Sequence, residues 1–212
     1  AMTREEAEKS MEVGIEKVRE LSGQGYKIIA TGEMGIGNTT TSSALASYFL
    51  QEDVEKMTGR GAGLTSKALE KKIAVVRKAI ADYSPAFTDA IDALAALGGF
   101  DIAGMAGVFL GGAIYRVPIV MDGFISSTAA LTATRICPAC KDFIMASHVS
   151  KEPAAEKILA AMDKEAALHC DMCLGEGTGA VTLFPILDLA TQIYEQMSTF
   201  EDIEIDAYVE LK

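Results

Sequence analysis

The chain has 212 residues, half of them hydrophobic, and a formal net charge of −11. This length suits one globular domain with at most a small appendage. The acidic excess, with no basic stripe to offset it, argues against nucleic acid as a partner. The acidic excess does not exclude a small anionic ligand, because such a ligand responds to local groups rather than to the total charge.

The first part of the chain predicts a helix, a strand and two further helices. Thr3 followed by acidic residues indicates a helix start, and this helix is expected to end at the glycines after Ser22. The apolar run 26–32 predicts a buried strand, and its glycine loop leads to a helix that begins near Asn38. Apolar residues at helical spacing predict another helix over 65–83.

The middle of the chain alternates helices with short apolar runs. We predict helices over 85–97 and 101–114, and strands over 117–123 and 141–147, each strand followed by a helix. The stretch 98–115 contains an aspartate and several glycines, so we interpret it as a buried helix with close backbone contacts, not as a membrane span. The alternation favours a helix-rich, Rossmann-like α/β fold: a parallel sheet of few strands with helices on both faces.

We expect three units along the chain. Residues 1–25 form an N-terminal helix that belongs to a small domain or a dimer arm, and residues 26–190 form an α/β nucleotide-binding catalytic domain. Residues 191–212 form a C-terminal helix and an acidic tail. So few strands among so many helices predict an under-covered sheet, which indicates missing sequence or a partner.

Each predicted strand ends in a glycine-rich or polar loop: GEMGIGN at 32–38, DGF at 122–124 and SHVSKEP at 147–153. In parallel sheets, ligands bind beyond the carboxyl ends of the strands, so these loops should converge on one crevice. The first loop lacks the lysine and the spacing of a Walker A motif, and is either a capped turn or a donor of N–H groups to an anion. His148 has no evident catalytic partner, which favours a hydrogen-bonded structural histidine.

Two further glycine motifs carry charged side chains. GRGAGL at 59–64 precedes a helix with Lys71 and Lys72. Backbone N–H groups and a lysine suit a phosphate monoester, although such lysines also fit an ordinary surface. LGEGTGA at 174–180 places Glu176 between glycines, either as a proton acceptor aimed at a substrate or as a carboxylate that stabilises the next helix.

The four cysteines form two Cys-x-x-Cys pairs, Cys137 with Cys140 and Cys170 with Cys173. Two such pairs typically bind zinc, but here a strand and a helix separate them, which exceeds the spacing of a zinc ribbon. We therefore favour reduced cysteines in a core or a site, with a zinc site and a redox pair as the alternatives.

In chain order, several segments resemble one family, the nicotinate-nucleotide–dimethylbenzimidazole phosphoribosyltransferases of cobalamin synthesis. They are TGEMGIGNTT, GRGAGL, GGFDIAGMAGVFLGGA, PIVMDGFISSTAAL, ASHVSKEP and LGEGTGAV, and the similarity runs from about Ile28 to Ala190. The resemblance implies transfer of phosphoribose from nicotinate mononucleotide to 5,6-dimethylbenzimidazole or a related base. The products are nicotinate and α-ribazole 5′-phosphate, and neither a metal nor a bound cofactor is implied.

By resemblance, Glu176 falls on the general base of the family. A neutral benzimidazole that attacks C1′ through one nitrogen must lose the proton on its other nitrogen, and a carboxylate that accepts this proton prevents positive charge from accumulating. Attack from the opposite face explains inversion from β to α. The substrate-binding positions that the resemblance implies are Gly61, Lys72 and Gly123 at the phosphate, Glu33 on the ribose side, and Ser150, Leu174 and Gly175 beside the leaving base.

The resemblance also implies a cytoplasmic homodimer that binds small molecules and neither nucleic acid nor membrane; the sequence shows no signal peptide. Family members carry a long N-terminal segment without a counterpart here, so we expect a fragment that holds the nucleotide side of the site and transfers phosphoribose poorly alone. Two other hypotheses stay open. One is a truncated, catalytically weak nucleotide-binding module, and the other is an interaction domain regulated by zinc or redox chemistry at the cysteines.

Overall fold

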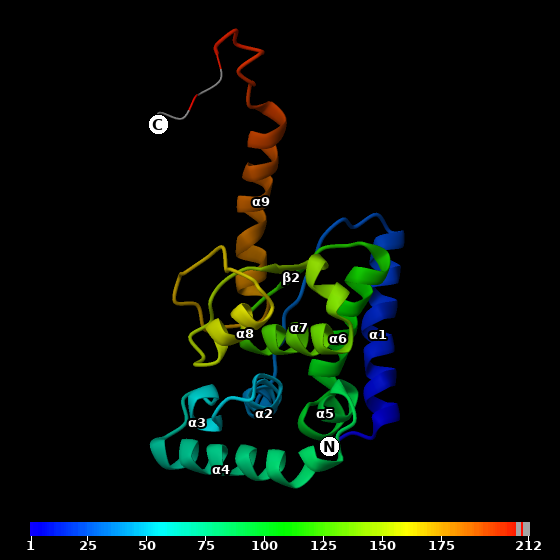
Figure 1. Ribbon diagram of the computed structural model, residues 1–212, viewed down its shortest axis with the longest axis vertical. Coiled ribbons are helices and arrows are strands. Elements are labelled where there is room, and N and C mark those ends of the chain that lie inside the picture. Colours follow the sequence, from blue (N-terminus) through cyan, green and yellow to red (C-terminus); the bar gives the residue numbers. More distant parts are fainter. Residues whose placement is uncertain (207–208, 210–212) are drawn as a thin grey trace.

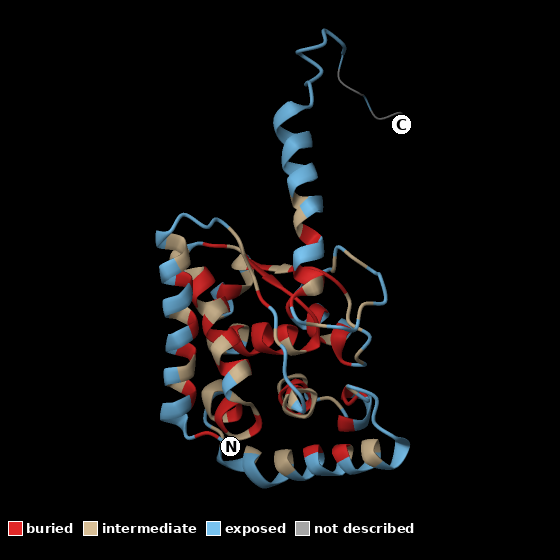
Figure 2. Cartoon of the chain, turned by 180° about the vertical axis from the view of Figure 1, so that it is seen from behind, coloured by how far each residue is buried: buried red, intermediate tan, exposed pale blue. Residues whose placement is uncertain are grey.

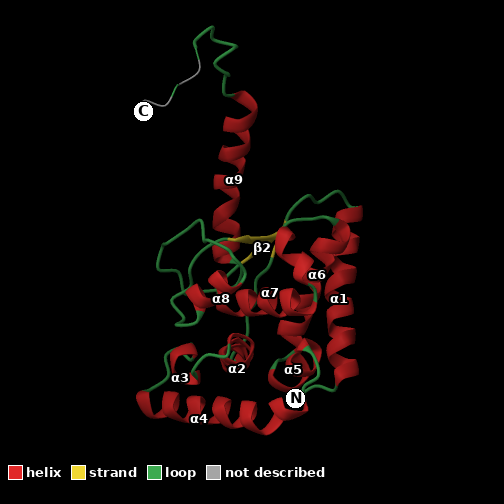
Figure 3. Ribbon diagram, viewed as in Figure 1, coloured by secondary structure: helices red, strands yellow, loops and turns green. Residues whose placement is uncertain are grey.

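The computed structural model of the chain describes residues 1–206 and 209, and shows a helix-rich body around a small sheet (Figures 1 and 3). Within these residues the sheet contains β1 (Ile29–Ala30), β2 (Ile119–Met121) and β3 (Ile144–Ala146), which pair in this order and are all parallel. The predicted fold class is confirmed, although each strand is shorter than the apolar run that predicted it.

Helices surround this sheet and form most of the body. They are α1 (Arg4–Gly23), α2 (Asn38–Leu50), α3 (Val54–Met57), α4 (Ser66–Tyr83), α5 (Ala90–Leu97), α6 (Phe100–Tyr115), α7 (Phe124–Ile136), α8 (Ala155–Ala161) and α9 (Thr178–Gln196), with 3₁₀ turns at Ser84–Ala86 and Pro138–Phe143.

The single helix predicted over 85–97 is wrong in its first part. Pro85 lies in a 3₁₀ turn, the backbone is extended at Phe87, and α5 begins only at Ala90. Asp89 sets this start, because its side chain accepts the N–H groups of Ile91 and the following residue. The short helix α3 was not predicted from the sequence.

The two faces of the sheet bury different amounts of apolar surface. Side chains alternate along a strand, so Ile119 and Ile144 belong to the main core with α2, α6 and α7. Val120 lies on the opposite face, where Ala180 and Leu183 of α9 cover it. Figure 2 shows that α9 continues outward from the body as a largely exposed helix. Both faces therefore carry helices, but the second is thinly covered, as the sequence predicts.

Helices α1 and α6 pack with their backbones in direct contact (Figure 1). A Cβ atom on Gly14 would lie 2.0 Å from the carbonyl oxygen of Gly104, and one on Gly107 would lie 2.0 Å from the carbonyl oxygen of Met11. The stretch 98–115 is thus a buried helix with close backbone contacts, as predicted. Among the described residues, no helix combines the length and apolarity that a membrane span requires.

The division of the chain into three units stays a prediction, and the boundary expected at residue 190 lies inside α9. The chain beyond α9 is exposed through Asp206. Residues 207–208 and 210–212 of the expected acidic tail lie outside the described residues.

Replacement of Gly107 by Ala should destabilise the fold by about 2 kcal/mol or more, because the methyl group meets the backbone of α1. Gly104→Ala is the matched control on the same helix, since its Cβ would lie 3.9 Å from the nearest atom, the oxygen of Ser10. It should be neutral or stabilise by up to about 1 kcal/mol through helix propensity. Denaturant unfolding measures both variants, and equal stabilities would contradict the contact.

Candidate active site

The loops that follow the three strands meet at one cavity of about 830 Å³, a size typical of small-molecule sites. Its wall contains residues 33–39 after β1, residues 123–125 after β2, and several residues between 148 and 153 after β3. Residues 58–62, Leu69 and residues 173–176 also line it. The convergence predicted from the ends of the strands is therefore confirmed.

Glu176 lies in this wall on a left-handed turn. Its φ is +58°, and the φ angles of Gly175 and Gly177 are +78° and +82°. A side chain in this region costs about 1 kcal/mol, which the surrounding contacts must offset. One such contact is the Glu176 N–H, which donates to the carbonyl oxygen of Glu33 at 3.1 Å. Both glutamates thus line one cavity, and their loops are joined through the backbone.

Close backbone approach explains the glycine that precedes Glu33. A Cβ atom on Gly32 would lie 2.5 Å from the amide nitrogen of Gly177. Any larger residue would push apart the two loops that carry the glutamates.

Asp122 holds the loop that carries Glu176, a role that was not predicted from the sequence. Its buried carboxylate accepts hydrogen bonds from the N–H groups of Gly177 (3.0 Å), Gly179 (2.8 Å) and Ala180 (3.2 Å). These groups begin α9, whose N-cap glycine offers no side chain for them. The available signal was an aspartate at the end of a buried strand, directly before a glycine.

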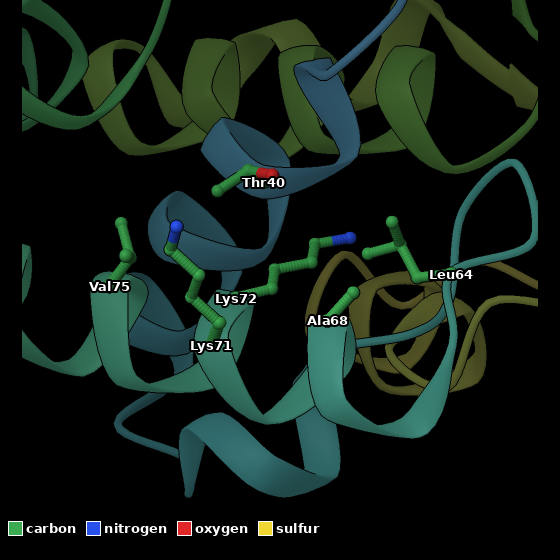
Figure 4. A pocket seen from close by; sticks show the side chains of 6 residues that line it. All are labelled: Thr40, Leu64, Ala68, Lys71, Lys72 and Val75. Carbon is green, nitrogen blue, oxygen red and sulfur yellow. The ribbon is translucent and has the colours of Figure 1, made fainter.

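Lys72 lies behind the cavity wall and not in it. Its buried ammonium donates to Thr39 Oγ1 at 2.8 Å and to the carbonyl oxygen of Gly59 at 3.0 Å, and both partners line the cavity. Burial lowers the pKa of Lys72, and the charge of Glu152 opposes this shift. Figure 4 shows that Lys71 and Lys72 leave α4 in different directions, beside a second hollow of about 270 Å³.

Gly61 lies beside Thr39, the residue that Lys72 contacts. Its N–H donates to Glu152 Oε1 at 3.1 Å, its φ is +53°, and a Cβ atom there would lie 2.8 Å from Thr39 Oγ1. Within the part of the chain that the structure describes, the buried Glu152 Oε2 has no hydrogen-bond partner. The loop at 59–61 is therefore fixed by one buried cation and one carboxylate.

The remaining predicted residues also line the cavity: Gly123, Ser150, Leu174 and Gly175. Gly123 precedes α7 without a side-chain cap, so the first N–H groups of this helix have no capping side chain. His148 is buried and hydrogen-bonded, as predicted for a structural histidine, but it lines the cavity as well. Of the predicted site residues, only Lys72 is absent from the wall.

The comparisons with known proteins agree with this geometry. A family model described as "Phosphoribosyltransferase" matches residues 1–205. The chain is 54% identical over 212 residues to the nicotinate-nucleotide–dimethylbenzimidazole phosphoribosyltransferase of Clostridium acetobutylicum, and 50% identical to that of Ruminiclostridium cellulolyticum. The chain belongs to the nicotinate-nucleotide–dimethylbenzimidazole phosphoribosyltransferase family.

The fold agrees with this family as well. The crystal structure of CobT from Thermus thermophilus matches with a TM-score of 0.92 and 36% identity, over 97% of this chain and 61% of that one. The two bacterial relatives are covered to 60% of their length. The chain thus spans about three fifths of the phosphoribosyltransferases that it resembles.

The cysteines of this family member do not gather at a metal site. All four are free thiols, and residues 1–206 and 209 contain no cluster of three or more His, Cys, Asp or Glu suited to a metal ion. Cys140 is buried in the core, and burial raises the pKa of its thiol to about 12. Cys173 is exposed in the cavity wall. These positions give no support to the hypothesis of a zinc-regulated interaction domain.

Asp122→Asn should loosen the turn that carries Glu176, because one amide oxygen cannot replace a carboxylate that accepts three N–H groups. Hydrogen exchange at residues 177–180 should accelerate about 10-fold or more, as expected for the loss of a charged hydrogen bond. Asp188→Asn, at an exposed position of α9, is the control and should leave this exchange unchanged. Unchanged exchange in Asp122→Asn would show that the turn holds without the carboxylate.

Proposed function

We propose that this chain forms the nucleotide side of an enzyme site that transfers phosphoribose from nicotinate mononucleotide to 5,6-dimethylbenzimidazole or a related base. The observation that carries the proposal is Glu176, held in a left-handed turn in the wall of a cavity that also contains glycine loops suited to a phosphate. Two relatives that align with the whole chain are named as nicotinate-nucleotide–dimethylbenzimidazole phosphoribosyltransferases, and these names support the same reaction.

Glu176 acts as the general base in this proposal. One nitrogen of the benzimidazole forms a bond to C1′ while the bond from C1′ to the pyridinium nitrogen breaks and its electron pair leaves with nicotinate. The proton on the other benzimidazole nitrogen passes to the carboxylate of Glu176, so the product azole is neutral. Attack opposite to the leaving group inverts C1′ from β to α. The Glu33 carbonyl and Asp122 hold the turn of Glu176 in place.

The phosphate lies at the loop 59–61 and the beginning of α7 in the same proposal. Lys72 supplies the positive charge, and its contacts with Thr39 and Gly59 place this charge directly behind the wall. Ser150, Leu174 and Gly175 border the leaving nicotinate. The four free cysteines agree with a reducing compartment, and we expect the enzyme in the cytoplasm.

Glu176→Gln should lower the turnover of the complete protein about 100-fold or more and leave its affinity for nicotinate mononucleotide within about twofold. The amide keeps the shape of the side chain but cannot accept the proton. Single-turnover kinetics and calorimetry separate the two effects. Glu195→Gln, at an exposed position of α9, is the control. Near wild-type turnover in Glu176→Gln would exclude this glutamate as the base.

Lys72→Met should weaken the binding of nicotinate mononucleotide about 10- to 100-fold, because the positive charge directly behind the proposed phosphate loop is lost while the buried stem is kept. Binding of nicotinate riboside, which has no phosphate, should change little. Lys71→Met, which alters the exposed neighbour on α4, is the matched control. Equal losses for both ligands would show that Lys72 does not serve the phosphate.

We also propose that the enzyme is a homodimer. Ile186, Leu189 and Ile193 lie on one side of the projecting part of α9 with exposed fractions of 42%, 59% and 59%. An apolar stripe on a helix commonly packs against a partner. Light scattering on the purified complete protein should give the mass of two chains, and the mass of one chain would reject the dimer.

A further inference from the structure

The hydrogen bonds of Ser147 determine where His148 carries its proton. Ser147 Oγ donates to the carbonyl oxygen of Met121 at 2.6 Å, and a carbonyl oxygen can only accept. A serine hydroxyl has one proton, so the same Oγ must accept in its second contact, at 3.0 Å from His148 Nδ1. Nδ1 is therefore the protonated nitrogen, and Nε2 of the neutral ring carries a lone pair.

The surroundings favour this neutral form. His148 is 4% exposed, and burial lowers the pKa of its imidazole. Asp122 Oδ1, 3.9 Å from Nδ1, opposes this shift. The oxygens of this carboxylate accept three N–H groups at the beginning of α9 and make no hydrogen bond to the ring, and the net shift of the His148 pKa is downward.

Nε2 lies beside Gly123 in the cavity wall, at a point that Ser150 also approaches. A Cβ atom on Gly123 would lie 3.7 Å from Nε2, and 3.9 Å from Ser150 Cβ. All three residues line the cavity. The Nδ1 side of the ring packs closely against the backbone at Gly179, because a Cβ atom on Gly179 would lie 1.9 Å from Nδ1. Within the described residues the ring's hydrogen bond is made by Nδ1, which leaves Nε2 available to a ligand.

We propose that Nε2 of His148 accepts a hydrogen bond from a hydroxyl group of the bound sugar. This role rests on the proposed function, in which the phosphate lies near Gly123 and the leaving base near Ser150. Ribose connects these two groups in nicotinate mononucleotide, so a side chain beside Gly123, where Ser150 also approaches, is placed to meet ribose. A lone pair repels the oxygens of a phosphate dianion and matches an O–H donor. His148 is thus a binding residue that selects a hydroxylated sugar.

Calorimetry tests the role with nicotinate mononucleotide and its 2′-deoxy and 3′-deoxy analogues. For wild-type protein, one analogue should bind about three- to tenfold more weakly than the parent nucleotide, the loss expected for one hydrogen bond. In His148→Phe, which keeps a ring but has no acceptor, the same analogue and the parent should bind alike. His169→Phe alters the other, exposed histidine of the chain and should behave as wild type.

The role would be overturned if the deoxy analogue lost the same affinity, relative to nicotinate mononucleotide, in wild type and in His148→Phe. It would also be overturned if wild-type protein bound both analogues with the affinity of the parent nucleotide. Wild-type protein that does not bind nicotinate mononucleotide would reject the proposed function and the ribose contact with it.

Nitrogen NMR of the wild type decides the case if His148→Phe fails to fold. Long-range ¹H–¹⁵N correlations should show the Nδ1–H form in the free protein, and the Nε2 resonance should shift with nicotinate mononucleotide and less with one deoxy analogue. An Nε2–H form, or equal shifts with all three ligands, would overturn the proposal.

Discussion

Asp122 connects the sheet to the turn that carries Glu176. A series of buried hydrogen bonds holds Asp122 itself in place. Its N–H donates to Ser126 Oγ at 3.1 Å, and Ser126 Oγ lies 2.5 Å from Thr31 Oγ1 at the end of β1. Because Thr31 donates its proton to the carbonyl oxygen of Val120, Ser126 must donate to Thr31 and accept from Asp122. In this series of hydrogen bonds, the donor and the acceptor of each bond are therefore determined.

The same logic extends to β3 through Ser147 and His148, so the ends of all three strands are joined by buried polar contacts. Buried polar groups are costly unless they are paired, and a fully paired network allows one arrangement only. The sheet is small and one face is thinly covered, so apolar burial alone would fix its edge weakly. Hydrogen bonds at the carboxyl ends of the strands therefore set the geometry of the cavity wall.

The sequence predicted the parallel sheet and the shared cavity because both follow from local patterns. Strand, loop and helix recur, and Glu33 and Glu176 lie in glycine loops that such a fold brings together. The role of Asp122 could not be predicted, because its partners lie 55 to 58 residues away in sequence. Lys72 was predicted by its motif, but its place behind the wall depends on Thr39, which only the tertiary structure brings near. The helix predicted over 85–97 was wrong in its first part for a local reason, because the N-cap at Asp89 starts α5 only at Ala90.

Two carboxylates near the cavity thus have different chemical capacities. Asp122 is buried, and three N–H groups direct their hydrogens at its oxygens, so its lone pairs are engaged in structure. Glu176 is exposed in the wall, and the contact that places it is made by its backbone N–H, which leaves the side chain available to a ligand. The left-handed turn makes this division, because it directs the backbone of residues 177–180 toward Asp122 and leaves the carboxylate of Glu176 in the cavity wall. The glycines on either side are the residues that adopt such a turn at little cost, which explains why Glu176 lies within the sequence LGEGTGA.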